Sequence, residues 1–203
     1  DPGTDPGTPP PPMDPAEPND STATASLLTV VDGRVQANGT VGDGEYFGAD
    51  VDLYVINLWA GSEIRLDIDA RSLATPSTLD SYLRLFDATG RQLARNDDSR
   101  GSLDSQLSFT VQVTGSYFIG VSSYGNSRYD PAVDGSGRSG RTTGDYLLTV
   151  DVDAPDRPST MTTMGFPDEA PPTHVVELLR SAAFATMGAG GNSGGRWTLD
   201  RVR

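Results

Sequence analysis

The feature that most constrains this chain is a two-residue period of apolar side chains, which recurs in six short segments. The clearest case is EIRLDIDA (63–70), in which Ile64, Leu66 and Ile68 alternate with charged residues. Side chains of a β-strand point alternately to opposite faces, so we expect each segment to bury one face and to leave the other in water. The other five segments are residues 51–58, 79–87, 106–113, 116–123 and 146–152.

Residues typical of turns separate these segments, and no helical pattern lies between them. Ala60-Gly61, Thr114-Gly115 and Thr143-Gly144-Asp145 are examples. Short strands at this spacing predict an all-β fold, an antiparallel, jelly-roll-like β-sandwich whose two sheets share one core. The polar loop 125–143 is longer than an ordinary hairpin connection, and its low apolar content predicts that it is dispensable for folding.

Composition divides the chain into four parts, of which the sandwich spans residues 17–153. Residues 1–16 hold a doubled DPGT unit and a run of four prolines, which predicts a semi-rigid spacer. Prolines in residues 154–172 predict a linker. Residues 173–203 combine a helical apolar stripe with a short alternating end. We expect this helix and strand to dock on the sandwich of the same chain or on a neighbouring subunit, with an inert tail as the remaining interpretation.

Composition also excludes several classes of function. The chain has no Cys, which excludes a disulfide framework, a thiolate zinc site and a cysteine nucleophile. All 15 basic residues are Arg, and the net charge of −13 argues against a nucleic-acid partner. No run approaches the roughly 18 apolar residues of a transmembrane helix. The first residue is Asp1, so we expect that a leader has been removed or that the chain is part of something longer.

The sequence offers no credible catalytic constellation, and the chain is not expected to be an enzyme. The segment around Ser193 (GNSGG, 191–195) resembles the nucleophile loop of chymotrypsin-like serine proteases. A catalytic triad also needs a base held against the serine. The one histidine, His174, lies upstream on the expected helix, without a surrounding double barrel. The match therefore reflects glycine-rich composition.

Four segments in order resemble the bacterial pre-peptidase C-terminal domain. They are EPNDS (17–21), DVDLYVINLWAG (50–61), residues 79–125 and GDYLLTVDV (144–152). The resemblance covers roughly residues 17–153 and implies a β-sandwich of the kind found beside secreted peptidases and on bacterial surface proteins. It therefore implies an extracytoplasmic, secreted or surface-anchored location. The family is related to the collagen-binding modules of secreted collagenases, several of which bind calcium.

The resemblance also implies a calcium site. Calcium prefers six to eight oxygen ligands, and the segment EPND supplies three oxygen-bearing side chains within four residues. In the calcium-binding relatives this segment carries ligands, joined by aspartates at the start of the strand that here reads Asp50-Val51-Asp52. The ligand set implied is Glu17, Asn19, Asp20, Asp50 and Asp52. Pro15 stands where the relatives have a further acidic residue. A capping turn is the alternative interpretation of the segment.

A second acidic cluster, Asn96-Asp97-Asp98, follows another expected strand, and Asp80 and Asp104 lie in matching Leu-Asp-Ser units. We expect these side chains to accept backbone N–H bonds and to shape turns. A second cation bound by the Asn96-Asp97-Asp98 cluster is the alternative. Tyr124 and Tyr129 lie near loop ends, and they are either ordinary surface tyrosines or an aromatic binding patch such as the collagen-binding relatives use.

These features favour a non-catalytic extracellular interaction or stabilising module that binds calcium. Its partner would be a protein, for which a matrix protein such as collagen is one candidate. The alternative function is a structural subunit of an extracellular filament or surface assembly, whose tails dock on neighbouring subunits.

Overall fold

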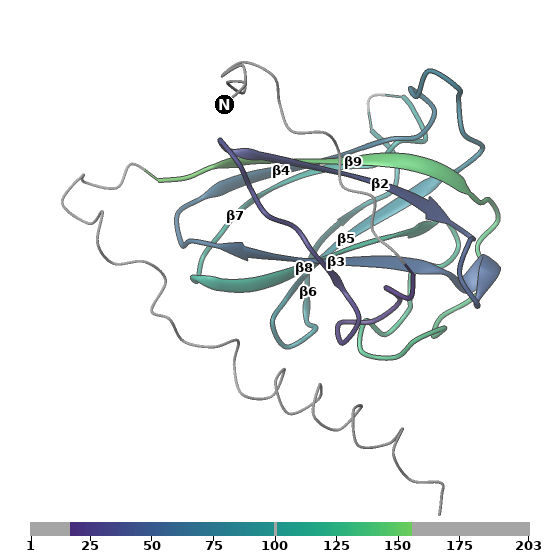
Figure 1. Ribbon diagram of the computed structural model, residues 1–203, viewed down its shortest axis with the longest axis horizontal. Helices are drawn as coiled ribbons and strands as arrows, with labels where there is room; N and C mark the ends of the chain where they lie inside the picture. The colour runs from purple at the N-terminus through teal and green to yellow at the C-terminus, as the bar shows by residue number, and fades with distance from the viewer. Residues whose placement is uncertain (1–16, 100, 156–203) are drawn as a thin grey trace, which may run out of the picture. The chain divides into compact units, whose positions relative to one another are not determined.

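The computed structural model describes residues 17–99 and 101–155, and these residues form two β-sheets packed face to face (Figure 1). The all-β, two-sheet prediction is confirmed. The predicted spacer (1–16), most of the predicted linker (154–172) and the predicted helix and strand (173–203) lie outside the described residues. No helix in the described ranges is long and apolar enough to cross a membrane.

The sheets have five and four strands, and each draws strands from both halves of the chain. The first sheet has the order β1-β3-β8-β5-β6, and the second has the order β2-β9-β4-β7. The strands are β1 (Ser26–Leu27), β2 (Arg34–Val41), β3 (Val51–Leu58), β4 (Glu63–Asp69), β5 (Ser81–Asp87), β6 (Gln92–Asn96), β7 (Gln106–Thr110), β8 (Gly115–Ser123) and β9 (Gly144–Asp153). A single 3-10 turn, η1 (Phe47–Ala49), precedes β3 in the described part of the chain.

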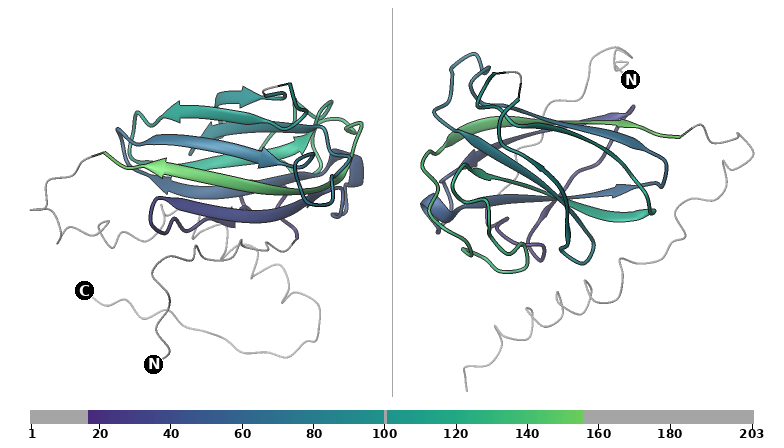
Figure 2. Two further views of the ribbon diagram at one scale, coloured as in Figure 1. Left: turned by 90° about the horizontal axis from the view of Figure 1, so that it is seen from above. Right: turned by 180° about the vertical axis from the view of Figure 1, so that it is seen from behind.

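Neighbouring strands pair antiparallel with one exception, which the sequence did not predict. The two residues of β1 pair parallel with β3, with Ser26 opposite Tyr54. The central pairs are long and regular, since β3 pairs with β8 along its whole length and β2 pairs with β9 in the same way. The two further views in Figure 2 show the strands of the sheets running through the body in separate layers.

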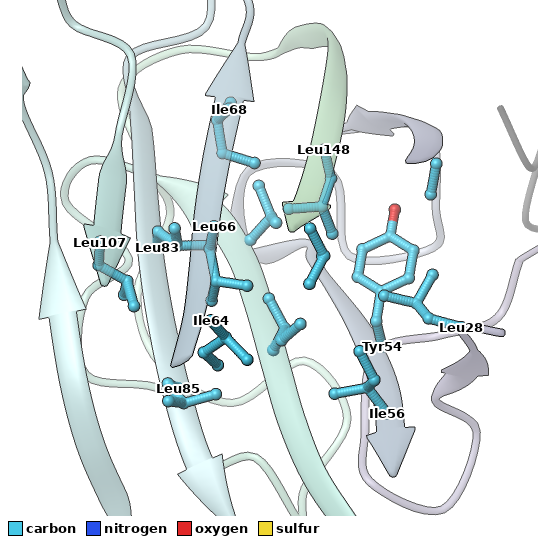
Figure 3. Close-up of a cluster of buried hydrophobic side chains, with 14 of the residues drawn as sticks. Leu28, Tyr54, Ile56, Ile64, Leu66, Ile68, Leu83, Leu85, Leu107 and Leu148 are labelled. Atoms are coloured by element: carbon cyan, nitrogen blue, oxygen red, sulfur yellow. The ribbon is translucent and has the colours of Figure 1, made fainter. Parts of the chain in front are cut away.

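The core lies between the two sheets and uses the alternation seen in the sequence. Ile64, Leu66 and Ile68 of β4 are all buried in it, as the period predicts. Figure 3 shows these side chains meeting Leu83, Leu85 and others from the opposite sheet. Each buried aliphatic side chain contributes about 1.5–3 kcal/mol relative to an exposed one, which makes this layer the main stabilising element.

The outer face of the five-stranded sheet is not wet, so the expectation of one solvent-facing side per strand is wrong for β3 and β5. Val51, Leu53 and Phe86 form a second buried cluster on this face. Tyr129, from the long loop 125–143, completes the cluster and is only 3% exposed. The expectation that this loop adds little to the core is therefore also wrong.

Close packing and a hydrogen bond, as well as burial, hold the loop 125–143 in place. Gly120 on β8 leaves space for the Tyr129 ring, because a Cβ atom at this position would meet the Tyr129 hydroxyl. Asn126 is fully buried, and its side-chain amide donates to the carbonyl of Ala49 at 3.0 Å. A glycine inside a strand often marks such a close approach.

Two strands, β1 and β2, have no counterpart in the sequence-based prediction. In β2 the side chains of Val35, Ala37 and Val41 are buried, but the pair Asn38-Gly39 interrupts the pattern with a typical turn signal. The structure places this pair inside the strand, where Gly39 faces Tyr146 of β9. Tertiary packing, not turn formation, explains the glycine.

Candidate functional site

The segment that contains the first candidate ligands is tied to the edge of β3 and to the long loop. The carbonyl of Asn19 accepts the backbone N–H of Leu53 at 2.9 Å. Three residues later, the N–H of Thr22 donates to the carbonyl of Pro131 at 2.7 Å. These bonds place Asn19 and its neighbours beside the start of β3, where the other predicted ligands lie.

Five carboxylates gather there in two overlapping groups. In one group Glu17, Asp20 and Asp50 each bring an oxygen within 4.8 Å of the others. In the other group Glu17, Asp43 and Asp52 do the same. Glu17 belongs to both. The structure thus brings together all the predicted carboxylates and adds Asp43, which the sequence did not nominate.

Within residues 17–99 and 101–155, no ion pair neutralises these carboxylates. The three ion pairs among the described residues are Arg34–Asp151, Arg65–Asp67 and Arg91–Asp87, and none of them involves the clustered carboxylates. Buried charges in proteins are normally paired or coordinate metals. A cation is therefore the partner that would complete this arrangement.

Three buried side-chain oxygens at the site have no hydrogen-bond partner in the described part of the chain. They are Oδ1 of Asn19, Oδ1 of Asp20 and Oδ1 of Asp50. An unsatisfied buried polar atom costs about 1–3 kcal/mol, and native structures contain few of them. Three such oxygens side by side with a carboxylate cluster are the arrangement that a hard cation would satisfy.

The turn before β3 shapes the space between these oxygens. The N–H of Gly42 donates to Oδ2 of Asp50 at 2.5 Å, which leaves Oδ1 of Asp50 free. A Cβ atom at Gly44 would lie 2.9 Å from that Oδ1 and 3.2 Å from Oε2 of Glu17. Glycine at position 44 therefore keeps open a space lined by two carboxylates.

The electrostatic cost of the cluster is visible in its pKa values. Burial raises the pKa of Asp50 to about 7, and the nearby carboxylates Asp20 and Glu17 add to the rise. Burial likewise raises the pKa values of Asp52, Asp43 and Glu17 above their ordinary values, and neighbouring acids push in the same direction. Without a cation, these groups hold protons more tightly than ordinary carboxylates do.

A pocket of about 330 Å³ opens beside the second carboxylate group. Its lining includes Glu17, Asp43 and Asp52 together with residues of β2 and β9. Within the pocket wall, Tyr146 donates to Oδ2 of Asp52 at 2.6 Å, and the hydroxyls of Tyr54 and Tyr146 are 2.7 Å apart. No local sequence signal marked Tyr146, because β9 and β3 belong to different sheets and Tyr146 reaches Asp52 only where the two sheets pack together.

Three of the side chains expected to shape turns, those of Asn96, Asp97 and Asp104, accept backbone N–H bonds. Oδ1 of Asn96 accepts the N–H of Gln106 at 2.9 Å, and Oδ1 of Asp97 accepts the N–H of Asp98 at 2.9 Å. Oδ1 of Asp104 accepts two backbone N–H groups, those of Ala70 and Arg71. Asp80 takes part through its backbone carbonyl, which accepts the N–H of Tyr124. Among the described residues, no group of three acidic side chains closes around Asp97 or Asp98.

The two tyrosines considered for a binding patch have different environments. Tyr129 is buried, and its ring packs edge-on against Phe86 at 6.0 Å between ring centres. Tyr124 is 39% exposed, with the Arg141 guanidinium 5.7 Å from its ring centre. A shared aromatic patch of these two residues is therefore wrong, because Tyr129 is part of the fold.

Comparison with curated proteins gives a match to one part of a larger enzyme. Over 114 residues the chain is 40% identical to a probable subtilase-type serine protease of Deinococcus radiodurans. The match covers 55% of this chain but only 14% of that protease, so the chain spans a small part of its relative.

Solved structures with a related arrangement share little sequence. The pre-peptidase C-terminal domain of a collagenase from Bacillus anthracis is 14% identical, with a TM-score of 0.42 over 68% of this chain and 100% of that one. A periplasmic inhibitor of g-type lysozyme from Aeromonas hydrophila is 17% identical, with a TM-score of 0.42 over 64% of this chain and 96% of that one.

The family model of the bacterial pre-peptidase C-terminal domain matches residues 50–123. This range begins at Asp50 and runs from β3 to the end of β8, so it contains four strands of the five-stranded sheet and two of the four-stranded sheet. It also contains Asp50 and Asp52 of the carboxylate cluster. Residues 50–123 of the β-sandwich thus match the bacterial pre-peptidase C-terminal domain family.

Proposed function

We propose that this domain is a calcium-stabilised, non-catalytic accessory module of a secreted or surface-anchored bacterial protein. The observation that carries the proposal is the set of unpartnered buried oxygens of Asn19, Asp20 and Asp50 within the carboxylate cluster. A module that only packed its core would not retain several uncompensated acidic groups in one place.

Calcium fits the donor set better than other common metals. The side chains at the site offer only carboxylate and amide oxygens, which hard cations prefer. Zinc and copper sites favour imidazole or thiolate ligands, and the chain contains no Cys and a single His. Calcium tolerates an irregular shell of six to eight oxygens. Asp43, backbone carbonyls or water would therefore complete the coordination shell that is begun by Glu17, Asn19, Asp20, Asp50 and Asp52.

The cation would act by holding the chain together. Glu17 to Asp20 precede the first strand, whereas Asp50 directly precedes β3 and Asp52 is its second residue. One ion bound by both segments would fasten residues 17–20, which precede the first strand, to the five-stranded sheet that contains β3. Support for an extracytoplasmic setting comes from the family and from the similarity to part of a subtilase-type protease. Calcium is plentiful in that setting, which suits a site of modest affinity.

The partner proposed for the module is a protein. Tyr46 and Phe47 lie in the turn between the candidate ligands Asp43 and Asp50, and 66% of Phe47 is exposed. Exposed aromatic side chains are typical of protein interfaces. Gel filtration distinguishes an accessory module from a subunit of an assembly, because the module is expected to run as a monomer and the subunit as a polymer.

The calcium proposal is tested by thermal melting of the full chain in calcium and in chelator, with unfolding monitored by circular dichroism. Ligand binding to the folded state alone adds about 2.7 kcal/mol at one hundred times the dissociation constant. For a domain of this size, this corresponds to a rise of about 10 °C. Asp20→Asn keeps the shape but removes a charge, and Gly44→Ala fills the space between two carboxylates. Both variants are expected to lose most of the rise.

The matched control is Asp97→Asn, which changes an aspartate of the second acidic cluster. It is expected to retain the whole calcium-dependent rise, because Asp97 belongs to neither carboxylate group. If the curves in calcium and chelator coincide for the unmodified chain, the proposed site does not exist. If Asp97→Asn abolishes the rise while Asp20→Asn does not, the calcium binds at the other cluster.

A further inference from the structure

Asp52 is a charged residue at a core position. In β3, Tyr54, Ile56 and Leu58 follow it at every second residue, and all three are buried in the main core. Asp52 shares their face and is only 1% exposed. A carboxylate in this position needs partners that hold it in one orientation, because solvent does not reach it to do so.

Two tyrosines from different sheets supply that orientation. The hydroxyl of Tyr146, on β9, donates to Oδ2 of Asp52 at 2.6 Å. A tyrosine hydroxyl has one hydrogen, so the 2.7 Å contact between Tyr54 and Tyr146 must be a bond that Tyr54 donates and Tyr146 accepts. The result is a directed chain from Tyr54 through Tyr146 to Asp52. Hydrogen bonds to a charged acceptor are shorter and about twice as strong as neutral ones.

The neighbouring strand is adapted to this chain. Gly39 of β2 lies directly opposite Tyr146 in the sheet. A Cβ atom at Gly39 would meet the end of the Tyr146 ring and its hydroxyl. The absence of a side chain at this position therefore gives the Tyr146 phenol the room to reach Asp52.

Asp52 also belongs to the carboxylate group with Glu17 and Asp43, beside the pocket. The bond from Tyr146 fixes the rotation of the Asp52 carboxylate about its last bond. It also occupies one lone pair of Oδ2, so the two oxygens of Asp52 are not equivalent toward a cation. Groups that hold a metal ligand from behind commonly tune the affinity of the site.

We propose that Tyr146 is a positioning residue of the cation site, which holds the Asp52 carboxylate in its binding orientation and is itself oriented by Tyr54. This inference rests on the proposed calcium site. It assigns to the two sheets separate tasks, since β3 supplies the ligand and β9 supplies the group that aims it.

The test is calorimetric titration of the full chain with calcium. Tyr146→Phe removes only the hydroxyl and is expected to weaken calcium binding about 10- to 100-fold, the usual effect of losing a partner of a metal ligand. Tyr54→Phe leaves the bond between Tyr146 and Asp52 in place, so a smaller fall in affinity is expected. Melting curves in chelator report separately on the stability of the calcium-free protein.

Tyr117→Phe is the matched control, because Tyr117 is also buried and its hydroxyl donates to a backbone carbonyl, that of Val113, at 2.6 Å. This variant is expected to lower the melting temperature without changing calcium affinity. A purely structural role for Tyr146 would give the same pattern, and unchanged calcium affinity in Tyr146→Phe would overturn the inference.

Two other outcomes, the absence of calcium binding and the misfolding of Tyr146→Phe, are interpreted as follows. If the unmodified chain gives no heat of calcium binding, the proposed function fails first and the inference fails with it. If Tyr146→Phe does not fold, Tyr54→Phe decides the question, and an affinity equal to that of the unmodified chain would overturn the inference.

Discussion

Replacing Tyr129 with alanine would measure how much the long loop contributes to the fold. Its ring is buried against Phe86, and the guanidinium of Arg84 lies 4.3 Å from the centre of the Tyr129 ring and 4.5 Å from that of Phe86. Arg84 also donates to the carbonyl of Tyr129 at 2.8 Å. The side chain of Tyr129 therefore closes a layer that includes a buried cation.

The expected cost follows from these contacts. Truncation of a buried aromatic side chain to alanine costs about 3–5 kcal/mol. A desolvated cation–π contact adds up to about 2 kcal/mol, part of which the first figure already includes. We therefore expect Tyr129→Ala to lower the free energy of unfolding by about 4–5 kcal/mol. This is a large share of the roughly 5–15 kcal/mol of a typical domain.

Thermal melting followed by circular dichroism, in saturating calcium, is the assay. A loss of this size lowers the melting temperature of a domain of intermediate length by roughly 10–20 °C. Tyr129→Phe keeps the ring and is expected to stay within about 1 kcal/mol of the unmodified chain. Tyr124→Ala changes an exposed tyrosine with a distant cation contact and is expected to cost about 1 kcal/mol or less. If Tyr129→Ala has the same melting temperature as Tyr124→Ala, the loop is not a packed part of the domain.

Two further predictions concern the carboxylate cluster. In chelator, the melting temperature should fall as the pH rises from about 4 to about 7, because the pKa of Asp50 is raised to about 7 in the folded state and the folded chain therefore binds more protons than the unfolded chain over that range. A rise in melting temperature over the same pH range would contradict the claim that the carboxylates of the cluster lack neutralising partners. Added calcium should oppose the fall in melting temperature, because the cation replaces the protons bound to the carboxylates. Gly39→Ala should weaken calcium binding in a titration, because the added methyl displaces the ring of Tyr146 from Asp52. An unchanged titration would mean that the ring shifts without disturbing that carboxylate.

The sequence predicted the strands whose alternation is strong and missed those whose alternation is interrupted. Segment 63–70 became β4 and segment 116–123 became β8, each within one residue of the prediction at both ends. β2 was missed because Asn38-Gly39 is a typical turn pair. A rule based on neighbouring residues cannot register that Gly39 is small for the sake of Tyr146 on a distant strand.

The candidate site was predictable to the extent that its residues stand in recognisable segments. Glu17, Asn19 and Asp20 stand in a short motif, and Asp50 and Asp52 open a strand with clear alternation. Asp43 has no such setting. It is one of 28 acidic residues, and only the folding of the turn 42–50 brings it to Glu17 and Asp52.

The long loop shows how a segment of low apolar content can still pack against the sandwich. A glycine-rich loop can be anchored by its backbone and by a few buried side chains, provided that its polar groups find partners. Here the N–H of Gly140 donates to the carbonyl of Gly48 at 2.5 Å, and the Asn126 amide donates to Ala49. Both acceptors lie in η1, within the turn that contains Asp43, Gly44 and Asp50. The loop thus supports the turn that shapes the candidate cation site, while its Tyr129 is buried against the outer face of the five-stranded sheet.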